Sequence, residues 1–300
     1  MKYKFSIIIP HKNTPDLLAK CLDSIPQRDD VQVIVVDDNS DPSIVDFDKF
    51  PGVKRKNTIV IFDKSGKGAG NARNIALDHI TDTKWLIFSD SDDYFTDYLG
   101  VAMDKYVDST YDMVYFKRHS VYVGTNEPAM RHQRANSRVD YALSTGDVNI
   151  IRYKDVAPVC KFVSYKIVKK HHLRFEPIRF SNDAMFFIQV GCYSNSIKVD
   201  GNPIYVVTER EGSLMKTFNE EALECRFFTS TRVIGVQKKF RVEKYHPNLF
   251  AYLYGFSKIR KSLAIKYFFK SLRYTPIKYW ASDLNACFKA YVKGNNRVLG

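Results

Sequence analysis

Residues 85–93 read Trp85-Leu86-Ile87-Phe88-Ser89-Asp90-Ser91-Asp92-Asp93, an apolar run that ends in a cluster of carboxylates. This pattern predicts a buried strand that stops at an acidic edge of a sheet, and open α/β sheets bind ligands at the carboxyl ends of their strands. Because clustered carboxylates repel one another, a bound cation is the natural compensation. Oxygen ligands of this type suit Mg²⁺ or Mn²⁺, which also hold substrate phosphates. The alternative is a solvated acidic turn that caps the next helix.

Around this strand, apolar β-rich runs alternate with segments that have helical spacing. We expect strands at 5–9, 31–36, 58–62, 85–88, 112–116 and 204–207. We expect helices at 15–25, 71–77, 156–168 and 183–192, a loop or lid at 122–145, and a largely helical segment from 219 onward. Strands that alternate with helices predict an α/β fold, with a mostly parallel central sheet flanked by helices.

The composition limits the partners that the protein can bind and the cellular compartment in which we expect it. The 300 residues are 45% hydrophobic, which is enough for one large core or two modest domains. A formal net charge of +13 fits a phosphate-rich substrate, a nucleic acid or an anionic membrane surface. Five scattered cysteines without zinc-type spacing favour a reducing compartment. With no predicted signal peptide or membrane span, we expect a cytoplasmic protein, with peripheral contact on the inner face of the cytoplasmic membrane as an option.

A second acidic pair follows the second predicted strand. Asp37 and Asp38 come directly after the run 31–36, much as Asp90 follows Phe88. Two neighbouring strands that end in carboxylates would form one acidic pocket, where a carboxylate can accept an N–H group of a base or the hydroxyls of a ribose. The alternative is a helix N-cap, because Asp, Asn and Ser are good capping residues.

Three glycines, Gly66, Gly68 and Gly70, precede the predicted helix that carries Arg73. Their spacing fits neither the dinucleotide-binding fingerprint nor the Walker A motif, so a flexible turn before a helix is the simpler interpretation. The presence of Arg73 in that helix favours instead a role for this segment in ligand binding. A guanidinium that lies among carboxylates and a phosphate or base edge is electrostatically reasonable.

Taken in order, four motifs resemble the family 2 glycosyltransferases of the GT-A fold, of the type that builds bacterial surface polysaccharides. The motifs are Ser6-Ile7-Ile8-Ile9-Pro10 through Asn13, Val35-Val36-Asp37-Asp38-Asn39-Ser40, Gly70-Asn71-Ala72-Arg73-Asn74 and Phe88-Ser89-Asp90-Ser91-Asp92-Asp93. The resemblance continues through Lys161 and Arg174-Phe175 to Asn182-Asp183, so it covers about two thirds of the chain.

The resemblance implies a role for each matching residue. Contacts with the donor nucleotide would come from Pro10, Asn13, Asp37, Asp38, Arg73, Asp90 and Ser91. Among these, Asp38 would accept the base N–H of a uridine-type nucleotide. Asp92, with Asp90, would bind a divalent metal, Mn²⁺ or Mg²⁺, and Asp93 would support the metal or the ribose. Asp183 would be the catalytic base.

One departure from the family pattern lies beside the catalytic base. The family often carries Glu-Asp where this chain has Asn182-Asp183, so the base is retained but its local field is less negative. Without the resemblance, Asp183 is better interpreted as a helix N-cap or first-turn residue, given the apolar run that follows it.

These assignments predict a metal-dependent, inverting glycosyltransferase. The metal would neutralise the diphosphate leaving group, and Asp183 would take the proton of the acceptor hydroxyl as it attacks from the opposite face. The donor would be a nucleotide sugar, with UDP as its nucleotide. The acceptor would be a glycan or a lipid-linked sugar in cell-surface polysaccharide synthesis.

Two other functions remain open. A nucleotidyltransferase can share an α/β nucleotide-binding fold, but it would show a basic Gly-rich loop near the N-terminus, which Pro10–Asn13 does not provide. A non-catalytic subunit that binds nucleotide sugars, or a scaffold subunit of a polysaccharide assembly complex, is the second alternative, and the Asn182 departure keeps it open.

The predicted domains are a GT-A catalytic domain at 1–218, made of a donor half (1–98) and an acceptor half (99–218), and a helical, basic and aromatic region at 219–300. That last region predicts either an amphipathic surface on anionic lipid or helices whose aromatic face packs on the catalytic domain. Nucleic-acid binding is disfavoured, because the acidic clusters oppose it and no recognised motif is present.

Overall fold

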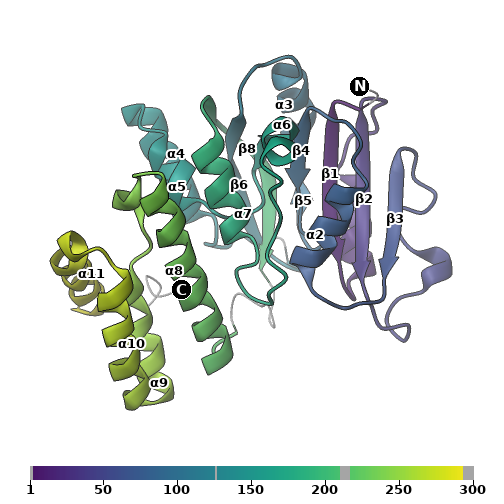
Figure 1. Cartoon of the computed structure of the whole chain (residues 1–300). Coiled ribbons are helices and arrows are strands. Elements are labelled where there is room, and N and C mark those ends of the chain that lie inside the picture. The colour runs from purple at the N-terminus through teal and green to yellow at the C-terminus, as the bar shows by residue number, and fades with distance from the viewer. Residues whose placement is uncertain (1–2, 126, 210–216, 293–300) are drawn as a thin grey trace. The chain divides into compact units, whose positions relative to one another are not determined.

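The computed structural model describes residues 3–125, 127–209 and 217–292. Within them, one sheet of eight strands has the order β3-β2-β1-β4-β7-β6-β8-β5 (Figure 1). The strands are β1 (Phe5–His11), β2 (Val31–Asp38), β3 (Thr58–Asp63), β4 (Trp85–Phe88), β5 (Tyr94–Phe95), β6 (Met113–Tyr122), β7 (Lys161–Ser164) and β8 (Ile197–Glu209). The chain divides into two compact units, Met1–Glu211, which holds the sheet, and Gly212–Gly300.

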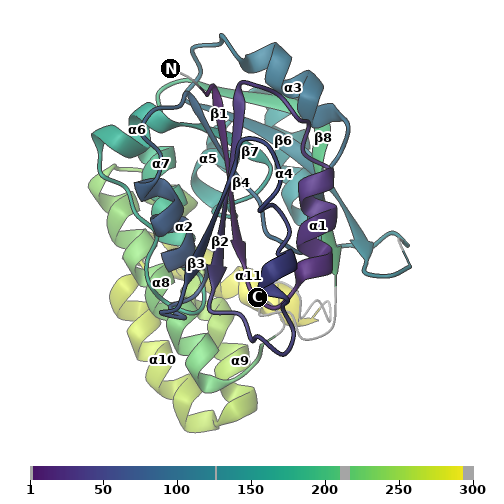
Figure 2. The same ribbon diagram turned by 90° about the vertical axis from the view of Figure 1, so that its right-hand side faces the viewer.

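Helices cover both faces of the sheet, as Figure 2 shows for α1 on one side and α2 and α7 on the other. Apolar residues of α1 (Pro15–Asp23) and α3 (Tyr98–Tyr106) pack in one core cluster. The second cluster receives residues from α2 (Ala69–Asp78), α4 (Gln133–Thr145), α5 (Asn149–Lys154), α6 (Tyr165–Lys170) and α7 (Ala184–Tyr193). A short 3₁₀ segment, η1 (Phe47–Lys49), lies between β2 and β3.

The first strand explains why the central strands are almost wholly apolar. Side chains alternate between the faces of a strand, so Phe5, Ile7 and Ile9 enter one core cluster while Ile8 enters the other. All seven residues of β1 are buried. Because helices cover both faces of the sheet, its central strands have continuously hydrophobic sequences rather than alternating hydrophobic and polar residues.

The predicted α/β fold with flanking helices is confirmed, but the sheet is mixed rather than mostly parallel throughout. Strands β3, β2, β1 and β4 are parallel neighbours. Strand β7 runs antiparallel to both β4 and β6, and β5 runs antiparallel to β8. Strands β6 and β8 are again parallel. The parallel strands β1 to β4 come from the first part of the chain, where the apolar runs that predict strands are clearest.

Two predicted segments were wrong, wholly or in part. Residues 156–168 were expected to form a helix, but they hold β7 followed by the start of α6. A short apolar run that is buried between two strands cannot be distinguished from a buried helix by its periodicity. The expected loop at 122–145 contains α4, whose apolar residues Val139 and Ala142 are buried.

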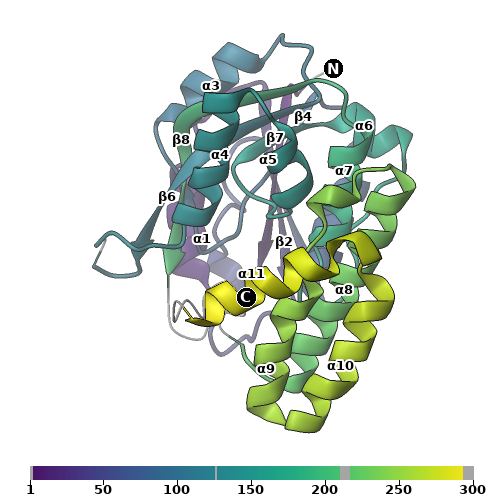
Figure 3. The ribbon, with the colours of Figure 1, turned by 90° about the vertical axis from the view of Figure 1, so that its left-hand side faces the viewer.

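The second unit is helical, as expected for the C-terminal region (Figure 3). It contains α8 (Glu220–Lys239), α9 (Tyr252–Ile259), α10 (Lys261–Tyr274) and α11 (Trp280–Val292), with the 3₁₀ segments η3 (Glu243–Tyr245), η4 (Leu249–Ala251) and η5 (Ile277–Tyr279). Phe227, Phe256 and Tyr267 form its own core, with the rings of Phe256 and Tyr267 stacked at 3.8 Å between centroids. In the described part of the chain, each helix is too short or too polar to cross a membrane.

The exact residues at which the predicted domains begin and end remain predictions. Residues 210–216, which precede the expected boundary at 218, and residues 293–300, which end the expected helical region, lie outside the described residues. The proposed division of the first unit into a donor half and an acceptor half is likewise a prediction.

A buried charge cluster lies under the sheet's centre. The fully buried Lys161 ammonium donates to the Asp155 carbonyl oxygen at 2.9 Å and lies 4.7 Å from the Phe187 ring centroid. Arg118 donates to the Asp155 carboxylate at 3.1 Å. Burial lowers the pKa of Lys161 to about 8, and burial would raise the pKa of Asp155, but the two cations hold it below its usual value.

Replacement of Asp155 by Ala should therefore destabilise the protein strongly, since two buried cations would lose their counter-ion. Breaking such a cluster typically costs about 3–5 kcal/mol of unfolding free energy. Urea denaturation measures this change in the free energy of unfolding, and Asp108→Ala, at an exposed position, is the matched control. A loss similar to that of the control would mean that Asp155 does not carry this charge balance.

Candidate functional site

The carboxyl ends of three parallel strands meet at one edge of the sheet. Strand β1 ends at His11, β2 at Asp38 and β4 at Phe88. The chain proceeds from β1 outward to β2 and β3 and then returns to β4 on the other side of β1, so a topological switch point lies between β1 and β4. Ligands of open α/β sheets bind at such points. The loops after β1 and β4 touch here, with Thr14 Oγ1 3.3 Å from Ser91 Oγ.

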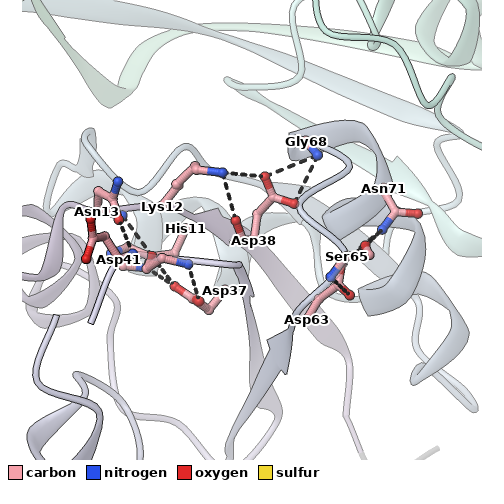
Figure 4. Close-up of polar contacts among 11 residues, drawn as sticks. His11, Lys12, Asn13, Asp37, Asp38, Asp41, Asp63, Ser65, Gly68 and Asn71 are labelled. Atoms are coloured by element: carbon pink, nitrogen blue, oxygen red, sulfur yellow. Dashed lines mark hydrogen bonds and ion pairs between the residues drawn. The ribbon is translucent and has the colours of Figure 1, made fainter. Parts of the chain in front are cut away.

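The Asp37 carboxylate connects the end of β1 to the loop that follows β2 (Figure 4). It is fully buried, and its Oδ1 lies 2.8 Å from His11 Nδ1. Ser40 donates to it through its hydroxyl and through its backbone N–H, which is 3.0 Å from Oδ2. Burial would raise the pKa of Asp37, but these hydrogen bonds outweigh it and lower the pKa. Asp37 thus has its oxygens engaged inside the protein, which suits a positioning role better than a direct donor contact.

The neighbouring Asp38 lies at the end of β2 and faces the loop before α2 (Figure 4). Its side chain is 7% exposed. The Gly68 N–H donates to both carboxylate oxygens, at 2.9 and 3.1 Å. The Lys12 ammonium donates to the Asp38 carbonyl oxygen at 3.0 Å and lies 3.6 Å from Oδ2. One loop therefore supplies a hydrogen-bond donor to this carboxylate, and the other supplies an ammonium that forms an ion pair with it.

The loop that presents Gly68 is anchored at its base. Asp63 accepts hydrogen bonds from the Ser65 N–H and from the Asn71 side chain, each at 3.0 Å (Figure 4). Gly66 and Gly68 have φ angles of +62° and +89°, a region that L side chains rarely adopt. The glycines thus allow a tight turn that points the Gly68 N–H at Asp38.

Arg73, on α2, connects the acidic end of β4 to the loop before α7. Its guanidinium donates to Asp90 Oδ1 at 2.6 Å and to Asn182 Oδ1 at 3.0 Å. The Arg73 side chain is 5% exposed and that of Asp90 40%. Among the described residues, Arg73 Nε is buried without a hydrogen-bond partner, which leaves one donor for a group that the chain itself does not supply.

Gly70 explains how α2 comes close enough for this connection. A Cβ atom at this position would lie 2.5 Å from the Glu176 carbonyl oxygen and 2.9 Å from Asn182 Cβ. A real Cβ atom essentially never lies this close to another heavy atom, so the helix can approach the segment before α7 because residue 70 has no side chain.

The acidic cluster after β4 is held by β8. Thr208 donates from its backbone N–H to Asp93 Oδ1 at 2.7 Å and from its hydroxyl to the Asp92 carbonyl oxygen at 2.6 Å. The Tyr205 hydroxyl accepts the Asp90 N–H at 2.9 Å. Burial, with the charges of Asp90 and Asp92, raises the pKa of Asp93 well above its usual value. A cation would relieve this repulsion.

The carboxylates of this cluster fit a metal that is shared with a ligand. Within the described residues, no group of three or more His, Cys, Asp or Glu side chains is arranged to hold a metal by itself. One oxygen of Asp90 already pairs with Arg73, while Asp92 is partly exposed. Mg²⁺ and related ions often use one or two carboxylates and take their other ligands from substrate phosphates and water.

Asp183 precedes α7 at the N-cap position. In the described structure its side chain makes no capping hydrogen bond, so the simple capping interpretation is not supported. Burial raises the pKa of Asp183 to about 6, the Arg73 cation opposes this, and Asp90 adds to it. A partly exposed carboxylate with such a pKa is ionised at neutral pH and still basic enough to accept a proton.

The structure thus brings most of the predicted site residues to one edge of the sheet. The residues at this edge are Asn13, Asp38, Arg73, Asp90, Ser91, Asp92 and Asp183. Pro10 and Asp37 lie within β1 and β2 and are buried. Sequence reasoning missed Lys12, although it stands beside the Pro10–Asn13 motif, and it missed Tyr205 and Thr208, whose distance of 115 to 116 residues from the acidic cluster leaves no local signal.

A family model described as Glycosyl transferase family 2 matches residues 6–171, which is more than half of the chain. The chain belongs to this family. The expected resemblance is thereby confirmed, and the matched segment includes every strand end described above together with Arg73 and the acidic cluster.

Curated relatives of this family 2 chain include enzymes of teichoic acid synthesis. It is 24% identical over 248 residues to the Staphylococcus aureus poly(ribitol-phosphate) beta-N-acetylglucosaminyltransferase TarS, which covers 78% of this chain and 40% of TarS. It is 27% identical to the Staphylococcus epidermidis teichoic acid poly(glycerol phosphate) polymerase, over 67% of this chain and 28% of that protein. It is 38% identical to a Bacillus spizizenii poly(ribitol-phosphate) beta-glucosyltransferase, over 30% of this chain and 15% of that protein. The chain thus matches less than half the length of these relatives.

Solved structures of S. aureus TarS share the fold. The crystal structure of S. aureus TarS 1–349 in complex with UDP-GlcNAc has a TM-score of 0.66 to this chain at 18% identity, covering 97% of this chain and 92% of that one. The UDP complex of the same fragment has a TM-score of 0.55 at 21% identity, covering 77% of this chain and 65% of that one. The GT-A fold assignment agrees with these structures.

The raised pKa of Asp183 predicts how its removal changes stability. The folded state has a pKa of about 6 against about 3.9 in an unfolded chain, so ionised Asp183 opposes folding increasingly between about pH 4 and pH 6 and fully above it. Asp183→Asn should therefore raise the melting temperature at pH 8, and by less at pH 5. Thermal unfolding at both values measures this, with Asp108→Asn as control. An equal shift at both pH values would contradict the raised pKa.

Proposed function

We propose that this family 2 chain is an inverting glycosyltransferase that moves a sugar from a UDP-sugar to a hydroxyl group of a glycan or lipid-linked acceptor in cell-surface polysaccharide synthesis. The observation that carries the proposal is the Arg73 bridge. It ties the acidic end of β4, through Asp90, to the segment that carries the uncapped Asp183. A leaving-group site and a base are thereby held at one edge of the sheet.

Each side chain has a distinct task in this proposal. Asp38 accepts an N–H group of the base, and Arg73 offers its unpartnered Nε–H to the donor. Asp183 accepts the proton of the acceptor hydroxyl, which then attacks the sugar carbon opposite to the departing diphosphate. A single displacement of this kind inverts the configuration at that carbon. Protein nucleophiles are not required.

A divalent metal, Mn²⁺ or Mg²⁺, is part of the proposal. Asp92, with help from Asp90, would hold it, and the bound ion would supply neutralisation of the diphosphate charge. The support is electrostatic, since burial and, after it, the charges of Asp90 and Asp92 raise the pKa of Asp93, and a shared cation would lower that repulsion.

The donor and acceptor classes are argued from the relatives. TarS is named as a poly(ribitol-phosphate) N-acetylglucosaminyltransferase and has been crystallised with UDP-GlcNAc, which supports a UDP-sugar for this chain. By name, the Bacillus relative is a poly(ribitol-phosphate) glucosyltransferase and the S. epidermidis relative is a teichoic acid polymerase. We propose an anionic, phosphate-rich surface polymer or its precursor as the acceptor, because the chain's net charge of +13 favours such a partner.

Two variants separate donor binding from chemistry. Asp92→Ala should remove the Mn²⁺-dependent part of UDP binding, because it deletes a metal ligand. Asp183→Asn should retain UDP binding but lower sugar transfer or donor hydrolysis by about 10²- to 10⁴-fold, the usual contribution of a general base. Thermal unfolding with UDP and Mn²⁺ measures the first effect, since a ligand at 100 times its Kd adds about 2.7 kcal/mol, and release of UDP measures the second.

The exposed Asp97→Ala is the matched control for both measurements, because Asp97 lies four residues beyond the acidic cluster and makes no capping bond in the described structure. Unchanged Mn²⁺-dependent stabilisation in Asp92→Ala would remove Asp92 from the metal site. Donor binding by the unaltered chain without transfer to any acceptor or to water would instead favour the non-catalytic or scaffold alternative.

We also propose that the second unit rests on an anionic membrane surface through α10. Four exposed residues at four-residue spacing, Lys261, Ile265, Phe269 and Arg273, form one row along this helix. Ile265 and Phe269 are 61% and 64% exposed, while Tyr267 packs into the unit's own core. An apolar centre between cations suits the boundary between acyl chains and anionic headgroups.

Co-sedimentation with lipid vesicles tests this surface. The whole chain should bind vesicles that contain phosphatidylglycerol and bind them less at high salt. The double variant Ile265→Ser/Phe269→Ser should bind at least several-fold more weakly, whereas Val53→Ser/Val101→Ser, which alters residues that are 53% and 54% exposed in the first unit, should bind like the unaltered chain. Equal binding by both double variants would reject the α10 row as the contact.

A further inference from the structure

Lys12 is placed to act on the same ligand group as Asp38. It follows the last residue of β1, and its side chain is 50% exposed, whereas that of Asp38 is 7% exposed. Its ammonium donates to the Asp38 carbonyl oxygen at 3.0 Å and lies 3.6 Å from the carboxylate (Figure 4). A ligand that reaches this carboxylate therefore also meets the Lys12 ammonium.

Both groups keep hydrogen-bonding capacity for a ligand. An ammonium has three N–H donors, and the bond to the Asp38 carbonyl uses one of them. A carboxylate has about four acceptor positions, and the Gly68 N–H is shared between its two oxygens. The result is an acceptor and a charged donor side by side, both held by contacts with the backbone.

We propose that Lys12 and Asp38 together select the nucleobase of the donor by its lactam edge, a ring N–H next to a carbonyl group. This inference rests on the proposed function, in which Asp38 accepts the ring N–H. Uracil then has a carbonyl on either side of that N–H, so the Lys12 ammonium finds an acceptor. Cytosine has no hydrogen on the equivalent ring nitrogen, which would face the Asp38 carboxylate with a lone pair. Lys12 is thus a specificity-determining residue for a uracil nucleotide.

The neighbouring cations are not placed in this way. Lys64 lies 4.6 Å from the ring centroid of Phe47, and Lys67 is exposed, although it directly precedes the Gly68 whose N–H binds Asp38. Lys67 therefore offers a matched control, because it carries the same charge in the other loop that reaches Asp38, while Lys12 has the side-chain contact with Asp38 in the described structure.

The experiment compares Lys12→Met, Lys12→Arg and Lys67→Met with the unaltered chain. Isothermal titration in the presence of Mn²⁺ gives the Kd for UDP, CDP, GDP and ADP. Loss of a hydrogen bond from a charged donor should raise the Kd for UDP by about tenfold or more and change the Kd for CDP much less. Lys12→Arg should restore part of the preference for UDP, and Lys67→Met should leave the ratio of the two Kd values unchanged.

Other results would overturn the inference in distinguishable ways. Equal weakening of all four nucleotides by Lys12→Met would place Lys12 on the diphosphate rather than on the base. An unchanged ratio of the Kd values for UDP and CDP would remove Lys12 from base selection while the proposed function stands. A preference of the unaltered chain for GDP would reject uracil. Failure of the unaltered chain to bind any of the four would overturn the proposed function itself.

Discussion

The geometry of the site depends on the ion pair between Arg73 and Asp90, which lie 2.6 Å apart. The same guanidinium holds Asn182 beside Asp183, so one cation sets the separation between the acidic end of β4 and the start of α7. Because Arg73 is almost wholly buried, its guanidinium has a fixed direction, while the 40% exposed Asp90 leaves the pair partly screened by solvent. If Arg73 were lost, the two ends of the site would each keep a carboxylate but share no common support.

The carboxylates of the site divide into two groups by their surroundings. Asp37 and Asp93 are nearly buried and accept hydrogen bonds from Ser40 and Thr208, so they shape the loops around the site. Asp90, Asp92 and Asp183 are more exposed and can reach a ligand. In β2 the strand geometry turns the side chains of the adjacent Asp37 and Asp38 toward opposite faces of the sheet. Asp90, Asp92 and Asp93 lie instead in the loop after β4, where the Thr208 N–H holds Asp93.

The sequence predicted the parts of the fold that local patterns control. Strands β1, β2 and β4 were recognised because both faces of the sheet are covered there and their runs are continuously apolar. Strand β3, at the edge of the sheet and partly exposed, was recognised by its β-branched run, and the residues at the ends of these strands identified the edge where the site lies. The strand at Lys161–Ser164 was missed because its identity depends on pairing with β4 and β6. The buried cluster of Arg118, Asp155 and Lys161 was equally inaccessible, since only the fold brings these charges together.

The close approach at Gly70 has a consequence for protein engineering. Since even a methyl group there would overlap the Glu176 carbonyl oxygen, this position is closed to variation, and a library that randomises it would consist largely of misfolded members. The turn just before it is constrained at some positions only: Gly66 and Gly68 have positive φ angles and the Ser65 N–H donates to Asp63, whereas the Lys67 side chain is exposed. Within a few residues the chain therefore offers one position, Gly70, that a side chain cannot occupy unless its neighbours move, and one, Lys67, whose exposed side chain can be varied without disturbing the support of the site.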